Sequence, residues 1–248
     1  MTRKRLTMTK AILLSAGQGR RLLPLTENLP KCMLPVAGKS ILQWQLDALL
    51  EVGIKDITIV TGFHSDIVEQ LLKLNYADET GVKILYNPFF NLSDNLASCW
   101  IARSCMHTDF LLINGDTIFE SAVPKQVLAS PAAPITLTID RKDRYDQDDM
   151  RVELNGLQVK NVSKVLSDEH THAESIGMLY FRESGPKLFR ENIEKAMQVP
   201  GGLKAWFLSV IDTLANENLV QACSVSGMRW AEIDFIADLE SARKLMSD

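Results

Sequence analysis

The sequence lacks the features that mark a membrane, an exported or a nucleic-acid-binding protein. No apolar run approaches the roughly 18 residues that a helix needs to cross a bilayer. The formal net charge is −4, so any anion must be bound by a local basic cluster rather than a basic face. The basic stretch TRKR at residues 2–5 is not followed by the apolar segment that a targeting peptide needs. We expect a ragged tail instead, with the native chain starting near Met8. We therefore expect a soluble, cytoplasmic protein with neither a nucleic acid nor a membrane as partner.

Cysteine is scarce, with four residues in a chain of 248. These are Cys32, Cys99, Cys105 and Cys223, which form no CxxC pair and no Cys/His cluster at the spacing of zinc ligands. We expect reduced thiols. The remaining composition, 46% hydrophobic and 23% charged, is ordinary for a globular protein and predicts one continuous α/β domain with unequal halves.

The first half of the chain alternates strand-like apolar runs with amphipathic helices. Strands are expected at 10–17, 56–62, 82–87 and 109–116, and helices from Ser40, Ser65 and Ser93. Gln43, three residues after Ser40, completes a capping box at the first helix. This alternation predicts a doubly wound, mainly parallel, Rossmann-like sheet, which binds its ligand at the carboxyl ends of the strands.

The second half of the chain has a different order of predicted elements. Extended runs are expected at 134–140, 150–154, 157–166, 174–181 and 219–225, with helices at 185–198, 203–216 and 235–246. We interpret them as a smaller mixed-sheet lobe that closes over the ligand. The predicted division is a nucleotide-binding half at 8–120 and an acceptor-substrate lobe with the C-terminal helix at 121–248.

The loop SAGQGRRLLPLTENLPK at 15–31 follows the first strand and carries glycines and fixed positive charge. A dinucleotide fingerprint would need glycine where Leu22 stands, and a P-loop ending in GKS at 38–40 would need glycine at Met33. What remains is a loop whose amides approach an anion while Arg20 or Arg21 offers a guanidinium and Lys31 a point charge. A solvated surface loop is the alternative.

This loop resembles the signature A-G-x-G-[ST]-R-L-x-P-L-T-x-x-x-P-K of the sugar-phosphate nucleotidyltransferase superfamily. Arg20 departs from it, since the family usually has a small hydroxyl residue there. The resemblance gives Arg21 and Lys31 catalytic roles. It also implies nucleotide contacts for Ser15, Ala16, Gly17, Gly19 and Arg20.

Two acidic residues resemble the metal-binding positions of the same superfamily. Asp116 ends the segment LLINGD, and Asp234 lies in WAEIDFIADLESA. Mg²⁺ takes one or two protein carboxylates and completes its octahedron with phosphate oxygens and water, so the pair implies a Mg²⁺ cofactor and catalytic roles for both residues. The alternatives are a turn-forming aspartate after Gly115 and a cap for the last helix.

The segment NPFFNLSDNLASCWIA at 87–102 resembles the N-N-hydrophobic-x-S-hydrophobic-aromatic pattern of bacterial choline-phosphate cytidylyltransferases. Asp94 replaces the first asparagine, while Asn95, Ser98 and Trp100 match. Asn95 offers both a donor and acceptors, so we expect it, with Ser98, to contact a pyrimidine. Helix capping is the alternative role for Asn95.

Lys164 and Glu174 resemble positions at which relatives contact the acceptor substrate. A phosphate would suit the lysine, and a quaternary ammonium would suit a carboxylate beside an aromatic face such as Trp206 or Trp230.

The resemblance implies an enzyme that joins CTP to a phosphorylated small alcohol, phosphocholine first, and releases pyrophosphate. UTP- or GTP-dependent transfer to a sugar 1-phosphate stays open, as do other acceptors such as a phosphonate or inositol phosphate, and a silent nucleotide-binding regulator. The sequence also leaves a homo-oligomer open.

Overall fold

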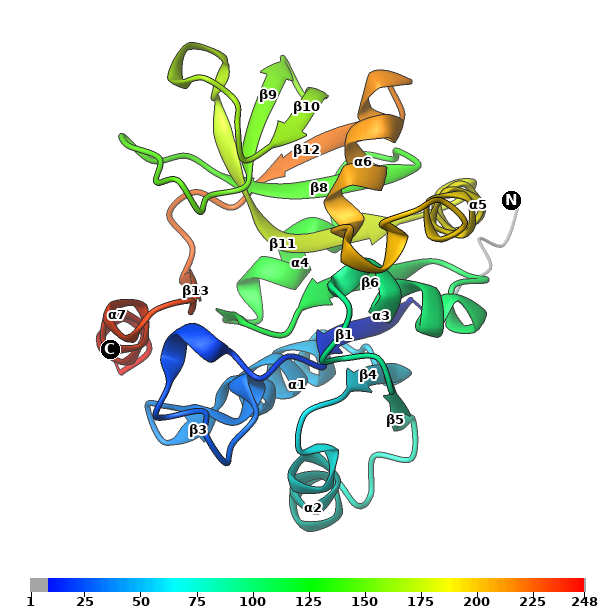
Figure 1. Cartoon of the computed structure of the whole chain (residues 1–248). Helices are drawn as coiled ribbons and strands as arrows, with labels where there is room; N and C mark the ends of the chain where they lie inside the picture. Colours follow the sequence, from blue (N-terminus) through cyan, green and yellow to red (C-terminus); the bar gives the residue numbers. More distant parts are fainter. Residues whose placement is uncertain (1–8, 248) are drawn as a thin grey trace, which may run out of the picture.

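The computed structural model describes residues 9–247 (Figure 1). The expected N-terminal tail and the start near Met8 lie outside these residues. Among residues 9–247, no helix is long and apolar enough to cross a membrane.

A sheet of nine strands, in the order β5-β4-β1-β6-β11-β8-β12-β10-β9, forms the centre of the molecule. Its first part is parallel and consists of β5 (Val82–Tyr86), β4 (Ile57–Thr61), β1 (Lys10–Ser15) and β6 (Phe110–Asn114). Strand β1 is buried along almost its whole length, because helices cover both faces of the sheet, and this explains its continuous apolar sequence.

The strands of the second half extend the same sheet. The long β11 (Ala173–Phe181) runs antiparallel to β6 and to β8 (Ile135–Asp140), and β12 (Val220–Ser224) is parallel to β8. The hairpin of β9 (Arg151–Asn155) and β10 (Gln158–Ser163) completes it. The predicted α/β fold class is confirmed, and the parallel part lies in the first half of the chain as expected.

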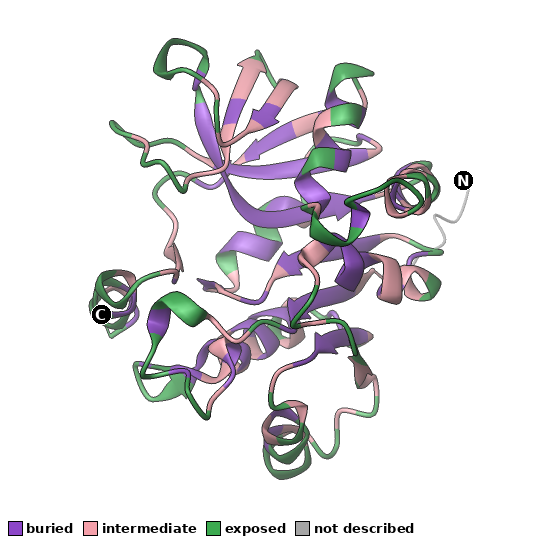
Figure 2. Ribbon diagram, in the orientation of Figure 1, coloured by how far each residue is buried: buried purple, intermediate pink, exposed green. Residues whose placement is uncertain are grey.

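Within residues 9–247, six α-helices pack on the two faces of this sheet, and a group of buried side chains lies between the sheet and the helices on each face. One face packs against α3 (Asn95–Ala102), α5 (Gly185–Met197) and α6 (Phe207–Asn216). The other packs against α1 (Ile41–Glu51), α2 (Ser65–Asn75) and α4 (Ala122–Leu128). Figure 2 shows the buried strands between helices whose outer faces are exposed. Short 3₁₀ turns lie at Arg20–Leu22, Lys31–Met33, Arg103–Cys105, Asp168–His170 and Gly202–Lys204.

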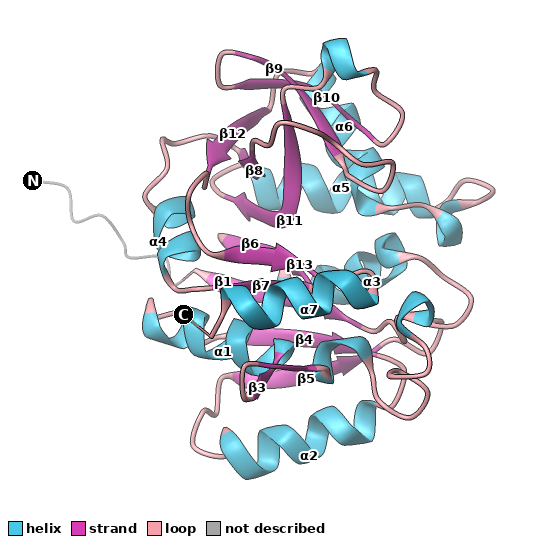
Figure 3. Ribbon diagram, turned by 90° about the vertical axis from the view of Figure 1, so that its left-hand side faces the viewer, coloured by secondary structure: helices cyan, strands magenta, loops and turns pink. Residues whose placement is uncertain are grey.

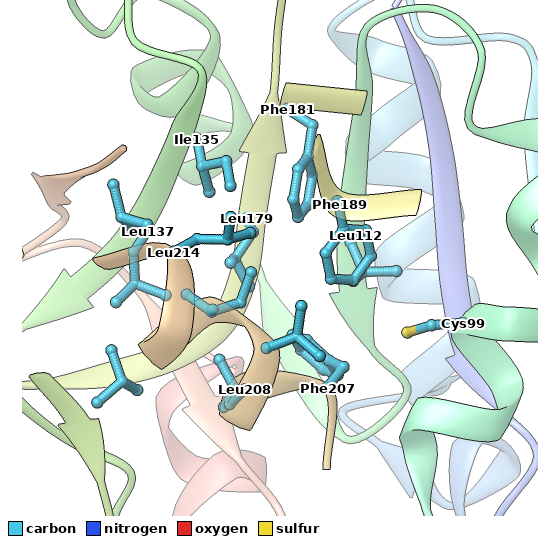
Figure 4. Close-up of a cluster of buried hydrophobic side chains, with 14 of the residues drawn as sticks. Cys99, Leu112, Ile135, Leu137, Leu179, Phe181, Phe189, Phe207, Leu208 and Leu214 are labelled. Carbon is cyan, nitrogen blue, oxygen red and sulfur yellow. The ribbon is translucent and has the colours of Figure 1, made fainter. Parts of the chain in front are cut away.

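Aromatic side chains fill the core on the side of α5 and α6 (Figure 4). Phe110 and Phe181, from the neighbouring strands β6 and β11, stack with their ring centroids 4.6 Å apart. The ring of Phe189 on α5 lies 4.6 Å from that of Phe181 and is tilted by 33° to it. This apolar contact joins the parallel and the antiparallel parts of the sheet into one core.

The helix starts agree with the sequence only in part. Ser40 and Gln43 form the expected capping box at α1. Ser65 was expected to cap α2, but it is the first helical residue, and His64 precedes it in a left-handed conformation. The helix expected from Ser93 begins at Asn95 instead, and the side chain of Asp94 before it caps no helix amide.

Two small sheets have no counterpart in the sequence analysis. A hairpin pairs β2 (Pro35–Val36) with β3 (Lys39–Ser40). More important for the site, β7 (Thr117–Phe119) pairs antiparallel with β13 (Trp230–Glu232), and α7 (Ile236–Leu245) packs beside β13 (Figure 3). The pairing of β7 with β13 brings the C-terminal part of the chain to the end of β6.

Candidate active site

The loop that follows β1 folds back on itself around a glycine. Gly19 has a φ of 76°, in the left-handed region, and its carbonyl oxygen accepts a hydrogen bond of 2.8 Å from Thr26 Oγ1. A Cβ at this position would lie 3.0 Å from Lys31 Cβ. Glycine is therefore needed at position 19 both for its backbone conformation and for the close approach of Lys31.

Lys31, Asp116 and Asp234 meet at the carboxyl ends of the strands and form what we call the lysine–aspartate cluster. Lys31 Nζ donates to Asp116 Oδ2 at 2.7 Å and to Asp234 Oδ1 at 2.6 Å. Burial lowers the pKa of Lys31, but the two carboxylates outweigh it and hold the pKa above its ordinary value. Burial raises the pKa of Asp234, but Lys31 and then Arg21 hold it below its ordinary value. Lys31 and Asp234 therefore carry their charges at neutral pH.

The two neighbouring arginines of the loop have different partners. Arg21 Nη1 lies 3.3 Å from Asp234 Oδ2 and 3.6 Å from Asp148 Oδ2, so its guanidinium faces the cluster. Arg20 instead donates to Asn91 Oδ1, in the segment after β5. Arg20 thus ties the loop to the chain that precedes α3.

Two carboxylates of the cluster suit a divalent cation that arrives with a ligand. Asp116 Oδ1 is buried and has no hydrogen-bond partner in the described chain. Residues 9–247 contain no group of three or more histidine, cysteine, aspartate or glutamate side chains placed to hold a metal alone. Asp116 and Asp234 could hold a divalent cation together with phosphate oxygens and water.

A polar cavity of about 220 Å³, here called the inner pocket, opens on one side of the cluster. It is lined by Leu14, Ala16, Gly17, Asn87, Phe90, Ser93, Asp94, Asn95, Ser98, Asn114, Gly115 and Asp116. Of the predicted nucleotide-binding residues, it thus brings together Ala16, Gly17, Asn95 and Ser98. The others lie elsewhere: Ser15 is buried at the end of β1, Gly19 packs on Lys31, and Arg20 binds Asn91.

The matched residues of α3 hold the wall of the inner pocket in place. Asn95 Oδ1 accepts from the backbone amide of Phe207 at 2.9 Å. Ser98 Oγ accepts from Asn87 Nδ2 at 3.0 Å, and Asn87 Oδ1 accepts from the amide of Phe89 at 2.8 Å. Contacts of Asn95 and Ser98 with a pyrimidine stay a prediction.

A second cavity, of about 280 Å³, opens on the other side of the cluster, and we call it the acidic pocket. It is lined by Lys142, Asp146, Asp148, Asp149, Glu174, Trp230, Glu232, Asp234, Phe235 and Asp238. Lys142 Nζ lies 2.8 Å from both Asp149 and Glu174. Burial raises the pKa of Glu174 to about 7, although Lys142 opposes the shift.

Of the two predicted acceptor residues, Glu174 lines the acidic pocket, whereas Lys164 lines neither the acidic pocket nor the inner pocket. The Lys164 ammonium stands over the Trp206 ring, 4.6 Å from its centroid, and its charge helps to lower the pKa of Asp234. The structure thus brings Lys164 within electrostatic range of the cluster.

The sequence analysis missed Glu232, which also faces the cluster. Burial, with the charges of Asp116 and Asp234, raises its pKa to about 8. The spacing E-x-D with Asp234 could have revealed it, because residues two apart in an extended segment share a face.

Comparisons with known proteins show the family of the chain. A nucleotidyl transferase family model matches residues 10–148. The chain is 37% identical over 126 residues to the CMP-5'-(3-aminopropyl)phosphonate synthase of Streptomyces rubellomurinus, an alignment that covers 50% of this chain and 20% of that protein. It is 25% identical to the CTP:phosphoglutamine cytidylyltransferase of Campylobacter jejuni, over 93% of this chain and 97% of the relative.

A solved structure shares the fold along nearly the whole chain. The CTP:phosphocholine cytidylyltransferase of Streptococcus pneumoniae superposes with a TM-score of 0.80 at 20% identity, covering 96% of this chain and 99% of that one. The chain spans 20% and 51% of the length of the first two curated relatives it matches. The nucleotidyl transferase family that the loop motif predicts is confirmed. This chain belongs to the nucleotidyl transferase family.

Proposed function

We propose that this protein is a Mg²⁺-dependent cytidylyltransferase that joins CTP to a phosphorylated small alcohol, with phosphocholine as the first candidate. An oxygen of the acceptor phosphate attacks the α-phosphorus of CTP in line, a phosphorus–oxygen bond forms, and the bond to the leaving pyrophosphate breaks. The nucleophile is already an anion, so no general base is needed. The observation that carries the proposal is the lysine–aspartate cluster, which lies between two polar pockets.

The side chains of the cluster act by position and charge. Lys31 contacts both the α-phosphate and the incoming phosphate, and Arg21 binds the β- and γ-phosphates of the leaving group. Asp116 and Asp234 would hold Mg²⁺, which would supply positive charge to neutralise the phosphates. The backbone of Ala16 and Gly17 lies against the base and ribose.

The two pockets take the two substrates. CTP occupies the inner pocket, within the half at 8–120, and the acceptor occupies the acidic pocket of the 121–248 part, all in one continuous domain. Many carboxylates with Trp230 and Phe235 support an acceptor that carries a positive charge, such as phosphocholine. The relatives that use CTP, according to their names, support the choice of nucleotide.

The proposal includes a cytoplasmic location. All four cysteines are free thiols in the structure, as is usual in a reducing compartment. Cell fractionation tests this part of the proposal.

A pyrophosphate-release screen tests the activity. The four nucleoside triphosphates are each combined with Mg²⁺ and with phosphocholine, a small aminophosphonate, inositol phosphate or a hexose 1-phosphate. The proposal predicts turnover with CTP and a small phosphorylated acceptor. Turnover with UTP or GTP and a hexose 1-phosphate, but none with CTP, would replace it with sugar nucleotide synthesis. No turnover with any pair would favour a nucleotide-binding regulator.

A further inference from the structure

The inner pocket has a phosphate end and a far end, and the two lie beyond different strands. Asp116 follows β6 and belongs to the lysine–aspartate cluster, whereas Asp94 and Ser93 belong to the segment that follows β5. Strands β1 and β4 lie between β5 and β6 in the sheet, so the segments that follow β5 and β6 line different parts of the pocket. If the triphosphate binds at the cluster, as the proposed function requires, the base lies at the far end.

The carboxylate of Asp94 lies at this far end and is free to accept a hydrogen bond. Its backbone is fixed, because its amide donates to Leu203 O at 2.8 Å and its carbonyl accepts from the amide of Ala97 at 3.2 Å. An aspartate before a helix usually accepts from the first helix amides, but the Asp94 side chain caps none. Its carboxylate makes no hydrogen bond and no ion pair with any residue between 9 and 247.

The neighbouring polar groups each already have a hydrogen-bond partner in the protein. The oxygens of Asn87 and Asn95 accept from the amides of Phe89 and Phe207, and Ser98 Oγ accepts from Asn87. Ser93 Oγ donates to Phe89 O. An ionised carboxylate can only accept hydrogen bonds, so this end of the pocket offers a free acceptor to whatever base occupies it.

We propose that Asp94 selects the nucleotide by accepting a hydrogen bond from the exocyclic amino group of cytosine. Uracil carries a carbonyl oxygen at the same ring position, and its lone pairs would face those of the carboxylate. Asp94 stands where the pattern of the choline-phosphate enzymes has asparagine, whose amide can turn either an oxygen or an amino group to the base. The inference rests on the proposed function and assigns the choice of CTP over UTP to one side chain.

The ratio of kcat/KM for CTP to that for UTP, measured with one acceptor, tests the assignment. Asp94→Asn keeps the size of the side chain, and we expect it to lower the ratio by roughly 10- to 100-fold, the discrimination that a base contact of this kind supplies. Asp66→Asn, an exposed position on α2, is the matched control and should leave the ratio unchanged. An unchanged ratio in active Asp94→Asn enzyme would overturn the assignment.

A substrate analogue makes the test independent of any variant. The triphosphate of 2-pyrimidinone riboside has hydrogen in place of the amino group of CTP. Wild-type enzyme should turn it over at least about tenfold less efficiently than CTP, and equal efficiency would contradict the role of Asp94. Wild-type enzyme that uses no nucleoside triphosphate contradicts the proposed function itself, so the two failures are distinguishable.

Discussion

Lys31 Nζ lies 2.6 Å from Asp234 Oδ1, although the two residues are 203 positions apart in the sequence. The contact depends on the pairing of β7 with β13, continued by a hydrogen bond of 3.1 Å from the amide of Ile233 to Asp116 O. This pairing holds the two carboxylates on either side of one ammonium group. Two anions thus lie around one cation. A phosphate–metal complex can replace these contacts, because the phosphate can bind Lys31 and the metal can bind the two carboxylates.

Replacing Lys31 by methionine should lower kcat by about 100- to 1,000-fold, the usual effect of losing one preorganised charge at a reacting phosphate. Methionine keeps the length of the side chain without its charge. Initial rates of pyrophosphate release at saturating substrates measure the effect. Lys83→Met, which removes an exposed lysine on β5, is the control and should be close to wild type. A fully active Lys31→Met enzyme would remove Lys31 from the mechanism.

Removal of Mg²⁺ with a chelator should abolish turnover, because the single positive charge of Lys31 is balanced by the carboxylates beside it and cannot alone neutralise a triphosphate. Asp116→Asn should raise the Mg²⁺ concentration for half-maximal rate by about tenfold or more, since Asp116 Oδ1 is the unpartnered oxygen of the pair. A Mg²⁺ titration of the rate measures both effects. Activity that persists in excess chelator would contradict the metal site.

Arg20 should act by anchoring the loop rather than by binding phosphate. Arg20→Ser and Asn91→Ala each remove the same hydrogen bond, so each should lower kcat/KM for CTP by about 2- to 10-fold. The double variant should be no worse than either single one, as expected for two partners in one contact. Effects that add in full would mean that Arg20 has a separate role, such as a phosphate contact.

The raised pKa of Glu174 predicts that the free energy of unfolding depends on pH. Burial raises its pKa to about 7, against 4.5 for a free glutamate, so between these pH values the folded protein binds a proton that the unfolded chain has released. The contribution of Glu174 to the free energy of unfolding therefore falls as pH rises from about 4.5 to 7. Glu174→Gln lacks this loss, so its stability relative to wild type should rise as pH rises across this window.

Urea unfolding of both proteins at a series of pH values measures the difference. A relative stability that is flat from pH 4.5 to 7 would show an ordinary pKa for Glu174 in the folded protein.

The sequence predicts the parallel half of the fold well because its signals are local. The buried strand β1 is a continuous apolar run, and the capping box of Ser40 and Gln43 marks the start of α1. The loop after β1 is recognisable for the same reason, since its glycines and charges lie within one short segment.

The features that the sequence does not predict depend on long-range pairing. Strands β7 and β13 have three residues each, too few for a period-two pattern, and they become strands by pairing with each other. Asp94 and Ser65 have the residue types of helix caps, but backbone contacts with Leu203 and a left-handed His64 set those helix starts instead. Glu232 lies only two residues before Asp234, but its other charged neighbours, Asp116 and Lys31, are distant in sequence.

The central claim is transfer of a cytidylyl group at the lysine–aspartate cluster. Mass spectrometry of the products formed from CTP, Mg²⁺ and phosphocholine, by wild-type and Lys31→Met enzyme side by side, tests it most directly. The account predicts a product with the mass of CTP plus phosphocholine minus pyrophosphate in the wild-type reaction, and almost none in the variant. No such product from the wild-type enzyme with phosphocholine or any other small phosphorylated acceptor, or equal amounts from both enzymes, would contradict it.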